Sequence, residues 1–130
     1  MKGLDTSILI LYLTQDDPIQ SSRANHIVDR TLSSEEPGFV SLVTIAEVAW
    51  VLHSRYKATR QEISLAIERI LASDSLRVQN EQQVYEAMLA LKAGAGTFAD
   101  ALICALGAWA GCSSTLTFDE SSRLAGFEVA

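Results

Sequence analysis

The sequence has little cysteine and no long apolar run, and each shortage excludes a class of protein. Two cysteines in 130 residues are too few for a scaffold stapled by disulfides. On one helix, Cys104 and Cys112 would lie about 12 Å apart, beyond the roughly 7 Å limit for a bridge. The longest apolar stretch, 101–112, is shorter than the roughly 20 residues of a bilayer-spanning helix. With an acid at Asp5, where a signal peptide needs apolar residues, we expect a reduced, cytoplasmic protein without a membrane partner.

Positive charge is also scarce. Sixteen Asp and Glu residues stand against ten Lys and Arg residues, which gives a formal charge of -6. This balance excludes a protein that binds nucleic acid through a broad basic face, but not one that binds it through a metal. A hydrophobic fraction of 48 % and a charged fraction of 20 % exclude disorder and fibrous repeats. We expect one domain over residues 1–130.

Several common catalytic motifs are missing. The chain contains no GxGxxG, GxxxxGK[ST] or GxSxG pattern, so dinucleotide-binding, P-loop and serine-hydrolase functions lack their motifs. His26 and His53 are far apart in the sequence and belong to no HExxH pattern. We interpret both as surface or packing residues.

Short apolar strands alternate with amphipathic helices along the chain. Strands are expected at 2–5, 39–40, 76–78, 114–118 and 127–129. Helices are expected at 8–13, 17–32, 41–52, 59–71, 80–91 and 97–110, with a short one at 119–124. Capping signals mark four of the starts, at Asp17-Pro18, at Ser41, at Thr59 with Glu62 and at Asn80. The alternation predicts an α/β domain with a mostly parallel sheet, whose ligands lie beyond the carboxyl ends of the strands.

Four acids lie within apolar sequence, unlike the other twelve: Asp5, Glu47, Asp100 and Asp119. A buried carboxylate is costly unless it is paired, protonated or bound to a metal. N-capping explains Asp5 and Asp119 as well as a functional role does, because each follows a strand and precedes a helix. Glu47 and Asp100 have no such local explanation, and no Lys or Arg lies three or four residues from either.

Carboxylates that converge at one sheet edge repel one another unless a divalent cation neutralises them. Oxygen ligands suit Mg²⁺ or Mn²⁺ better than zinc. The pattern therefore favours a metal site. On the helix of Asp100, a stripe of small residues follows at Cys104, Gly107 and Gly111, which would let the helix approach the sheet closely. We interpret Cys104 as a small core residue and not as a ligand or nucleophile.

At these acids the sequence resembles a PIN-domain ribonuclease, specifically a VapC-type toxin of a toxin–antitoxin pair. The resemblance runs from Lys2 to Val129, through four segments in the family's order: Gly3–Leu9, Ser41–Glu47, Phe98–Ile103 and Thr115–Asp119. Two features differ from the family's usual pattern. Ser7 stands where members often have Asn, and Thr97 and Phe98 stand where many carry a further acid.

The resemblance implies a three-layer α/β sandwich with a short, mostly parallel five-stranded sheet flanked by helices. It also implies a metal-dependent endoribonuclease in which Asp5, Glu47, Asp100 and Asp119 hold Mg²⁺, or Mn²⁺ in its place. Asp5 would be the central ligand and Asp119 would act through water. Three hydroxyl residues would orient these ligands: Thr6, Ser7 and Thr117. Four basic residues would contact phosphates that flank the cleaved bond: Arg55, Lys57, Arg60 and Lys92.

The resemblance also implies partners. Similar toxins form homodimers, and a small antitoxin silences them by placing an amphipathic tail in a groove beside the acids. We expect the exposed apolar residues Tyr12, Trp50 and Tyr56 to line that groove. The RNA substrate, the antitoxin and a second copy of the chain are the expected partners.

Two other functions remain open from the sequence. One is a catalytically inactive PIN-like module that only binds partners, for which Ser7 is the supporting departure. The other is a receiver-type phosphoacceptor domain of similar size. A receiver needs adjacent acids after its first strand and a lysine near its fifth, and here Asp5 has no acidic neighbour and no lysine follows Lys92.

Overall fold

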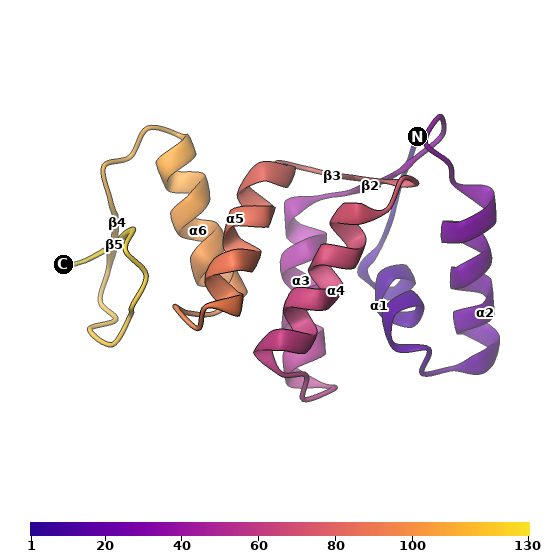
Figure 1. Cartoon of the computed structure of the whole chain (residues 1–130), viewed down its shortest axis with the longest axis horizontal. Helices are drawn as coiled ribbons and strands as arrows, with labels where there is room; N and C mark the ends of the chain where they lie inside the picture. Colours follow the sequence, from indigo (N-terminus) through magenta and orange to yellow (C-terminus); the bar gives the residue numbers. More distant parts are fainter. The chain divides into compact units, whose positions relative to one another are not determined.

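The computed structural model describes all 130 residues and divides them into two compact units, Met1–Glu81 and Gln82–Ala130 (Figure 1). The N-terminal unit contains β1 (Lys2–Gly3), α1 (Thr6–Thr14), α2 (Pro18–His26), a π-helical turn η1 (Ile27–Thr31), β2 (Gly38–Val40), α3 (Leu42–Ser54), α4 (Arg60–Ala72) and β3 (Leu76–Val78). The C-terminal unit contains α5 (Glu81–Lys92, whose first residue closes the preceding unit), α6 (Phe98–Trp109), β4 (Thr115–Thr117) and β5 (Phe127–Val129).

The N-terminal unit is built on a parallel sheet in the order β1-β2-β3. Gly3 pairs with Phe39, and Val40 pairs with Val78. Helices connect successive strands, as parallel pairing requires. As a result, β1 and β2 end at the same sheet edge, where they lead into the starts of α1 and α3.

The helices of this unit begin where the capping signals predict. The Asp17 carboxylate accepts hydrogen bonds from two backbone N–H groups of α2, and Pro18 occupies the first turn. The Ser41 hydroxyl accepts a bond from the backbone N–H of Thr44 at 3.1 Å. Thr59 and Glu62 form a reciprocal capping box at the start of α4. These predictions are confirmed, because each depends on local chemistry that the sequence displays.

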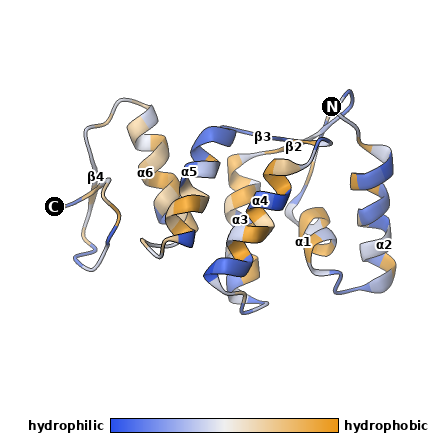
Figure 2. Ribbon diagram, viewed as in Figure 1, coloured by the Kyte–Doolittle hydropathy of each residue, from blue (hydrophilic) through white to orange (hydrophobic).

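The core of the N-terminal unit consists of apolar stripes from the strands and helices. Its largest fully buried apolar side chains are Leu9, Val28, Val40, Ile45, Val48 and Ile67. Burial of each stabilises the fold by about 1.5–3 kcal/mol relative to exposure. Figure 2 shows the contrast between α1, which is mostly hydrophobic, and α2, which is largely hydrophilic.

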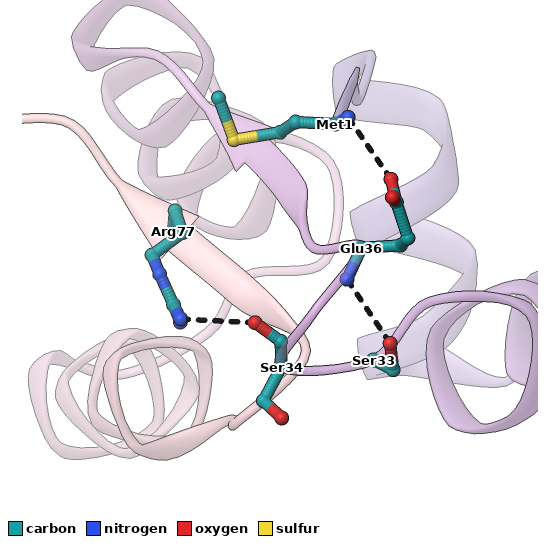
Figure 3. Close-up of polar contacts among 5 residues, drawn as sticks. All are labelled: Met1, Ser33, Ser34, Glu36 and Arg77. Atoms are coloured by element: carbon teal, nitrogen blue, oxygen red, sulfur yellow. Dashed lines mark hydrogen bonds and ion pairs between the residues drawn. The ribbon is translucent and has the colours of Figure 1, made fainter.

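The turn before β2 connects to both neighbouring strands, as Figure 3 shows. Its backbone N–H at Glu36 donates to the Ser33 hydroxyl at 3.1 Å. The amino group of Met1 lies 3.3 Å from the Glu36 carboxylate, and Arg77 in β3 donates to the Ser34 carbonyl oxygen at 3.2 Å. Exposed contacts of this kind contribute about 0–1 kcal/mol each. These contacts therefore orient the turn but add little to the stability of the unit.

In the C-terminal unit, β4 and β5 form a parallel pair packed against the small stripe of α6. A Cβ on Gly107 would lie 2.9 Å from the Thr115 hydroxyl, and one on Gly126 would lie 3.0 Å from the Cys104 Cβ. The predicted close approach is therefore confirmed at Cys104 and Gly107. Gly111 has a different role, because it has no neighbour within 4 Å and a φ of +100°. It ends the helical segment in a conformation that glycine favours.

The α/β class and all five strands are confirmed, and every strand pairing is parallel. The strands are divided between two sheets, however, and do not form the one sheet we expected. Strands of two or three residues form few backbone hydrogen bonds with a neighbouring strand. Here β4 and β5 form theirs with each other. The short helix expected at 119–124 is wrong, because this segment contains a turn at 120–121 and no helical residue. No helix has the length and apolar character needed to cross a membrane.

Candidate functional site

Asp5 lies at the sheet edge where β1 leads into α1. It occupies the N-cap position of α1 with extended backbone angles, but its side chain makes no capping hydrogen bond. The carboxylate is exposed, and the Ser7 hydroxyl donates to its Oδ2 at 3.3 Å. N-capping therefore does not account for this acid, and its oxygens remain available to a ligand.

Glu47 lies in the second turn of α3 and is linked to the start of α1. The hydroxyl of Thr6, a side chain only 8 % exposed, donates a short hydrogen bond to Glu47 Oε1. Thr6 directly follows Asp5 in the chain, so this bond links Glu47 to the segment that carries Asp5. The hydroxyl bonds without adding charge, and it leaves the second carboxylate oxygen of Glu47 for another partner.

The expected burial of the apolar-flanked acids is wrong for three of them. Asp5, Glu47 and Asp119 are exposed, and Asp100 is half-buried. For Glu47 the reason is the outer face of α3, where Val43 and Trp50 are 79 % and 66 % exposed. Apolar residues on both faces of one helix conceal the amphipathic pattern that would show Glu47 at the surface.

Asp100 occupies the third position of α6. Its backbone N–H donates to the hydroxyl of the N-cap residue Thr97 at 3.1 Å. A carboxylate in the first turn is stabilised by the partial positive charge of the helix N-terminus. Asp100 therefore has a local structural explanation, contrary to our expectation. One turn later, burial and then the negative charge of Asp100 raise the pKa of the Cys104 thiol, which suits a neutral packing residue and not a thiolate nucleophile.

Asp119 is exposed in the turn after β4. Its Oδ1 accepts hydrogen bonds from the Ser121 hydroxyl at 2.6 Å and from the Ser121 backbone N–H at 2.9 Å. These bonds, the side-chain bond first, lower the pKa of the Asp119 carboxyl below its ordinary value. The Asp119 backbone N–H donates to the Thr117 hydroxyl at 3.0 Å. The turn thus holds an ionised carboxylate through neutral groups.

The candidate acids fall into two pairs, one in each unit. Asp5 and Glu47 belong to the N-terminal unit, and Asp100 and Asp119 belong to the C-terminal unit. No group of three or more His, Cys, Asp or Glu side chains that could hold a metal ion is assembled in the structure. The donors themselves are all oxygens, the chemistry that Mg²⁺ and Mn²⁺ prefer. In donor type, the residues fit such an ion.

Sequence reasoning missed two hydroxyl residues beside the candidate acids. Thr97 caps the helix that carries Asp100, and Ser121 donates a hydrogen bond to Asp119. Both have recognisable signals. Thr97 precedes Asp100 by three residues, the spacing of an N-cap and its third helical position. Ser121 follows Asp119 by two residues, the spacing of a turn closed by an aspartate side chain.

The four candidate phosphate-binding residues are exposed, and the one ion pair in the structure is that between Met1 and Glu36. Arg55, Lys57 and Arg60 gather where α3 turns into α4, and Lys92 ends α5. Arg55 follows Glu47 by eight residues, which is about 12 Å along a helix. The three clustered cations therefore lie beyond the far end of α3 from the sheet edge.

Two open hollows lie on the N-terminal unit. The first, of about 360 Å³, is lined by residues of α1, α3 and α4 and the loop between the last two: Leu13, Thr14, Leu52, Tyr56, Ala58, Glu62, Leu65, Ala66 and Arg69. The second, of about 440 Å³, is lined by Trp50, His53, Ser54, Lys57 and Ala58.

The aromatic residues expected in one groove are thus separated. Tyr56 lines the first hollow, and Trp50 lines the second. Tyr12 lines neither; its hydroxyl donates to Asp29 at 2.9 Å, and Arg69 lies 5.0 Å from its ring centre.

Comparison with known proteins gives one match. The family profile described as "PIN domain" matches residues 3–127. No curated protein and no solved structure matches the chain. The matched range includes every candidate acid and its hydroxyl neighbours.

Proposed function

The chain belongs to the PIN-domain family, whose members are generally nucleases, and from this premise we propose that it is a metal-dependent endoribonuclease that hydrolyses RNA phosphodiester bonds. The observation that carries the proposal is the exposed Asp5 carboxylate, which caps no helix although it occupies an N-cap position. A carboxylate at a strand end without a structural task is available for chemistry. Glu47, held by Thr6 beside it, is the second.

We propose that residues 1–130 act as one PIN domain and that Asp5, Glu47, Asp100 and Asp119 hold Mg²⁺, for which Mn²⁺ substitutes. Bound divalent ions lower the pKa of a coordinated water and stabilise negative charge on phosphate oxygens. The protein's part is to keep four carboxylates ionised and oriented. Neutral hydroxyls suit this task, because they bind a carboxylate without cancelling the charge that attracts the cation.

Three of the four proposed ligands accept a hydrogen bond from a hydroxyl group in the structure. Thr6 holds Glu47, Ser7 donates to Asp5, and Ser121 keeps Asp119 ionised. Thr117 orients Asp119 through its backbone N–H. A bound metal would be the fixed positive charge at these acids, since no Lys or Arg forms an ion pair with any of them.

We propose that Arg55, Lys57, Arg60 and Lys92 contact phosphates on either side of the cleaved bond. Their exposure and lack of carboxylate partners leave their charge available to a polyanion. Few such contacts predict a shallow dependence of RNA affinity on salt.

We further propose that the chain is the toxin of a type II toxin–antitoxin pair and forms a homodimer in the cytoplasm. The first hollow, with Leu52, Tyr56 and Leu65 on its walls, suits the apolar side of an amphipathic antitoxin segment. For the homodimer, the supporting residues are Leu116 and Phe118, which are 68 % and 88 % exposed. A monomeric mass by light scattering would contradict the dimer, and a short reading frame for a DNA-binding protein just upstream would support the pair.

The decisive experiment is cleavage of a mixed RNA pool by the full chain with Mg²⁺, with EDTA, and by Asp5→Asn and Asp100→Asn. We expect cleavage with Mg²⁺ and a loss of at least a hundredfold in the other three. Glu68→Gln is the matched control, because it removes the same charge from an exposed residue of α4. Wild-type rates in both Asn variants would refute the site. No metal-dependent cleavage by the wild type would favour a PIN-like module that only binds partners.

A further inference from the structure

The second hollow of the N-terminal unit has no part in the metal chemistry described above. It lies where α3 ends, has a volume of about 440 Å³, and is lined by Trp50, His53, Ser54, Lys57 and Ala58. An indole, an imidazole and an ammonium group thus border one open depression. No carboxylate lines it, in a chain with a formal charge of -6.

The aromatic wall of the hollow is unusually exposed. Trp50 is 66 % exposed, and its ring centre lies 6.5 Å from that of His53 with the two planes tilted by 47°. An indole exposed to this extent offers a flat apolar face to a ligand. Such faces stack nucleic-acid bases without strong sequence preference.

The positive wall is held in place by the end of the helix. Lys57 Nζ donates to the Ser54 carbonyl oxygen at 3.0 Å, at the C-terminus of α3. Free carbonyl groups at a helix C-terminus stabilise a cation there. The ammonium therefore stays beside the hollow and retains further N–H donors for a phosphate.

The position of Trp50 relates the hollow to the proposed active site. Trp50 follows Glu47 by three residues on α3, so the two side chains are neighbours on one helix face, about 5–6 Å apart at their Cβ atoms. A strand of RNA with its scissile phosphate near Glu47 would carry an adjacent nucleotide past Trp50. The base of that nucleotide would then meet the Trp50 ring, and its phosphate would meet the Lys57 ammonium group.

We propose that this hollow is a nucleotide subsite, in which Trp50 stacks one base of single-stranded RNA beside the cleaved bond and Lys57 contacts its phosphate. The proposal rests on the proposed nuclease function and adds a residue that determines how substrate is positioned. A protein occupant is the alternative that the test must distinguish.

The first measurement is the steady-state kinetics of single-stranded RNA cleavage by Trp50→Ala, Trp50→Phe and Trp109→Ala. Loss of one stacked base predicts a KM increase of about 5- to 150-fold in Trp50→Ala. The Phe variant keeps a ring and should stay within a few-fold of wild type. Trp109, 72 % exposed at the end of α6, is the matched control and should not change KM. Circular dichroism verifies that each variant is folded.

The second measurement does not require cleavage. In the Trp109→Phe, Asp100→Asn background, Trp50 is the one remaining tryptophan, and a short oligouridylate should quench its fluorescence to saturation. Lys57→Gln should weaken this binding. Quenching without nuclease activity in the parent chain would support the subsite while refuting the proposed function.

Two results would overturn the subsite. One is a wild-type KM in Trp50→Ala together with no quenching by the oligonucleotide, while the parent chain still cuts RNA. The other is an unchanged KM together with a change of sedimenting mass in Trp50→Ala, which would assign the indole to a contact between protein chains.

Discussion

At the residue scale, three of the four candidate acids have a hydroxyl group as the partner of their carboxylate, and none of the four has a basic partner. Thr6 bonds Glu47, Ser7 bonds Asp5, and Ser121 bonds Asp119. A basic partner would neutralise the carboxylate and compete with a cation, whereas a hydroxyl only orients it. These carboxylates therefore keep the full negative charge that a divalent cation would need.

The Thr6 hydroxyl should control how well the site binds metal. In Thr6→Val the side chain keeps its shape but loses the bond to Glu47, so we expect Mg²⁺ affinity or Mg²⁺-dependent cleavage to fall about 10–100-fold. Thr6→Ser should retain most of the activity. Thr14→Val is the control, because the Thr14 hydroxyl bonds a backbone carbonyl at the other end of α1. A Mg²⁺ titration of RNA cleavage that is unchanged in Thr6→Val would contradict this role.

Ser121 should set the titration of Asp119. Its bonds hold the pKa of Asp119 below the ordinary value of 3.8, so Ser121→Ala should raise it towards that value. The stability from these bonds is present above the ordinary pKa and is lost as pH falls through the lower folded-state pKa. We therefore expect Ser121→Ala to be less stable than wild type at pH 7 and the difference to shrink below pH 3.8. NMR titration of the carboxyl carbon measures the pKa directly; identical curves would refute the assignment.

At the element scale, short polar signals predicted the helix starts correctly, whereas the apolar runs did not predict how the strands pair. Asp17, Ser41 and Thr59 each cap the helix that the sequence assigned to them. A cap is decided within four residues, so its evidence is present in the sequence. The division of the strands between two sheets depends on pairing between distant segments, which short apolar runs do not encode. The exposure of Glu47 was missed for a related reason, because apolar residues occupy both faces of α3.

Thr97 should stabilise the start of α6 and the position of Asp100. Thr97→Ala removes the acceptor for the Asp100 backbone N–H, so we expect a loss of about 0.5–2 kcal/mol in the free energy of unfolding. Thr97→Ser keeps the hydroxyl and should be close to wild type. Urea denaturation followed by circular dichroism measures the difference. Equal midpoints for the Ala and Ser variants would show that the cap contributes nothing.

At the scale of the whole molecule, the excess of acid is concentrated in the proposed ligands. Without those four carboxylates, twelve acids remain against ten bases. If a bound cation offsets those four, the remaining surface charge is nearly balanced, and its field neither attracts nor strongly repels a polyanion. Under the proposed function, RNA recognition would therefore depend on local groups, which are a bound metal, the few exposed cations and an aromatic face.

A divalent ion that binds the folded chain should stabilise it and reveal which acids share it. A ligand at a hundred times its dissociation constant adds about 2.7 kcal/mol, so millimolar Mg²⁺ or Mn²⁺ should raise Tm by several degrees. If all four acids hold the ion, Asp5→Asn in the N-terminal unit and Asp119→Asn in the C-terminal unit should each abolish most of that rise. Glu68→Gln should keep it, and Ca²⁺ in place of Mg²⁺ tests whether charge alone suffices. A rise that survives in Asp119→Asn but not in Asp5→Asn would exclude Asp119 as a ligand and contradict the four-acid site, because the ion would then bind without that carboxylate.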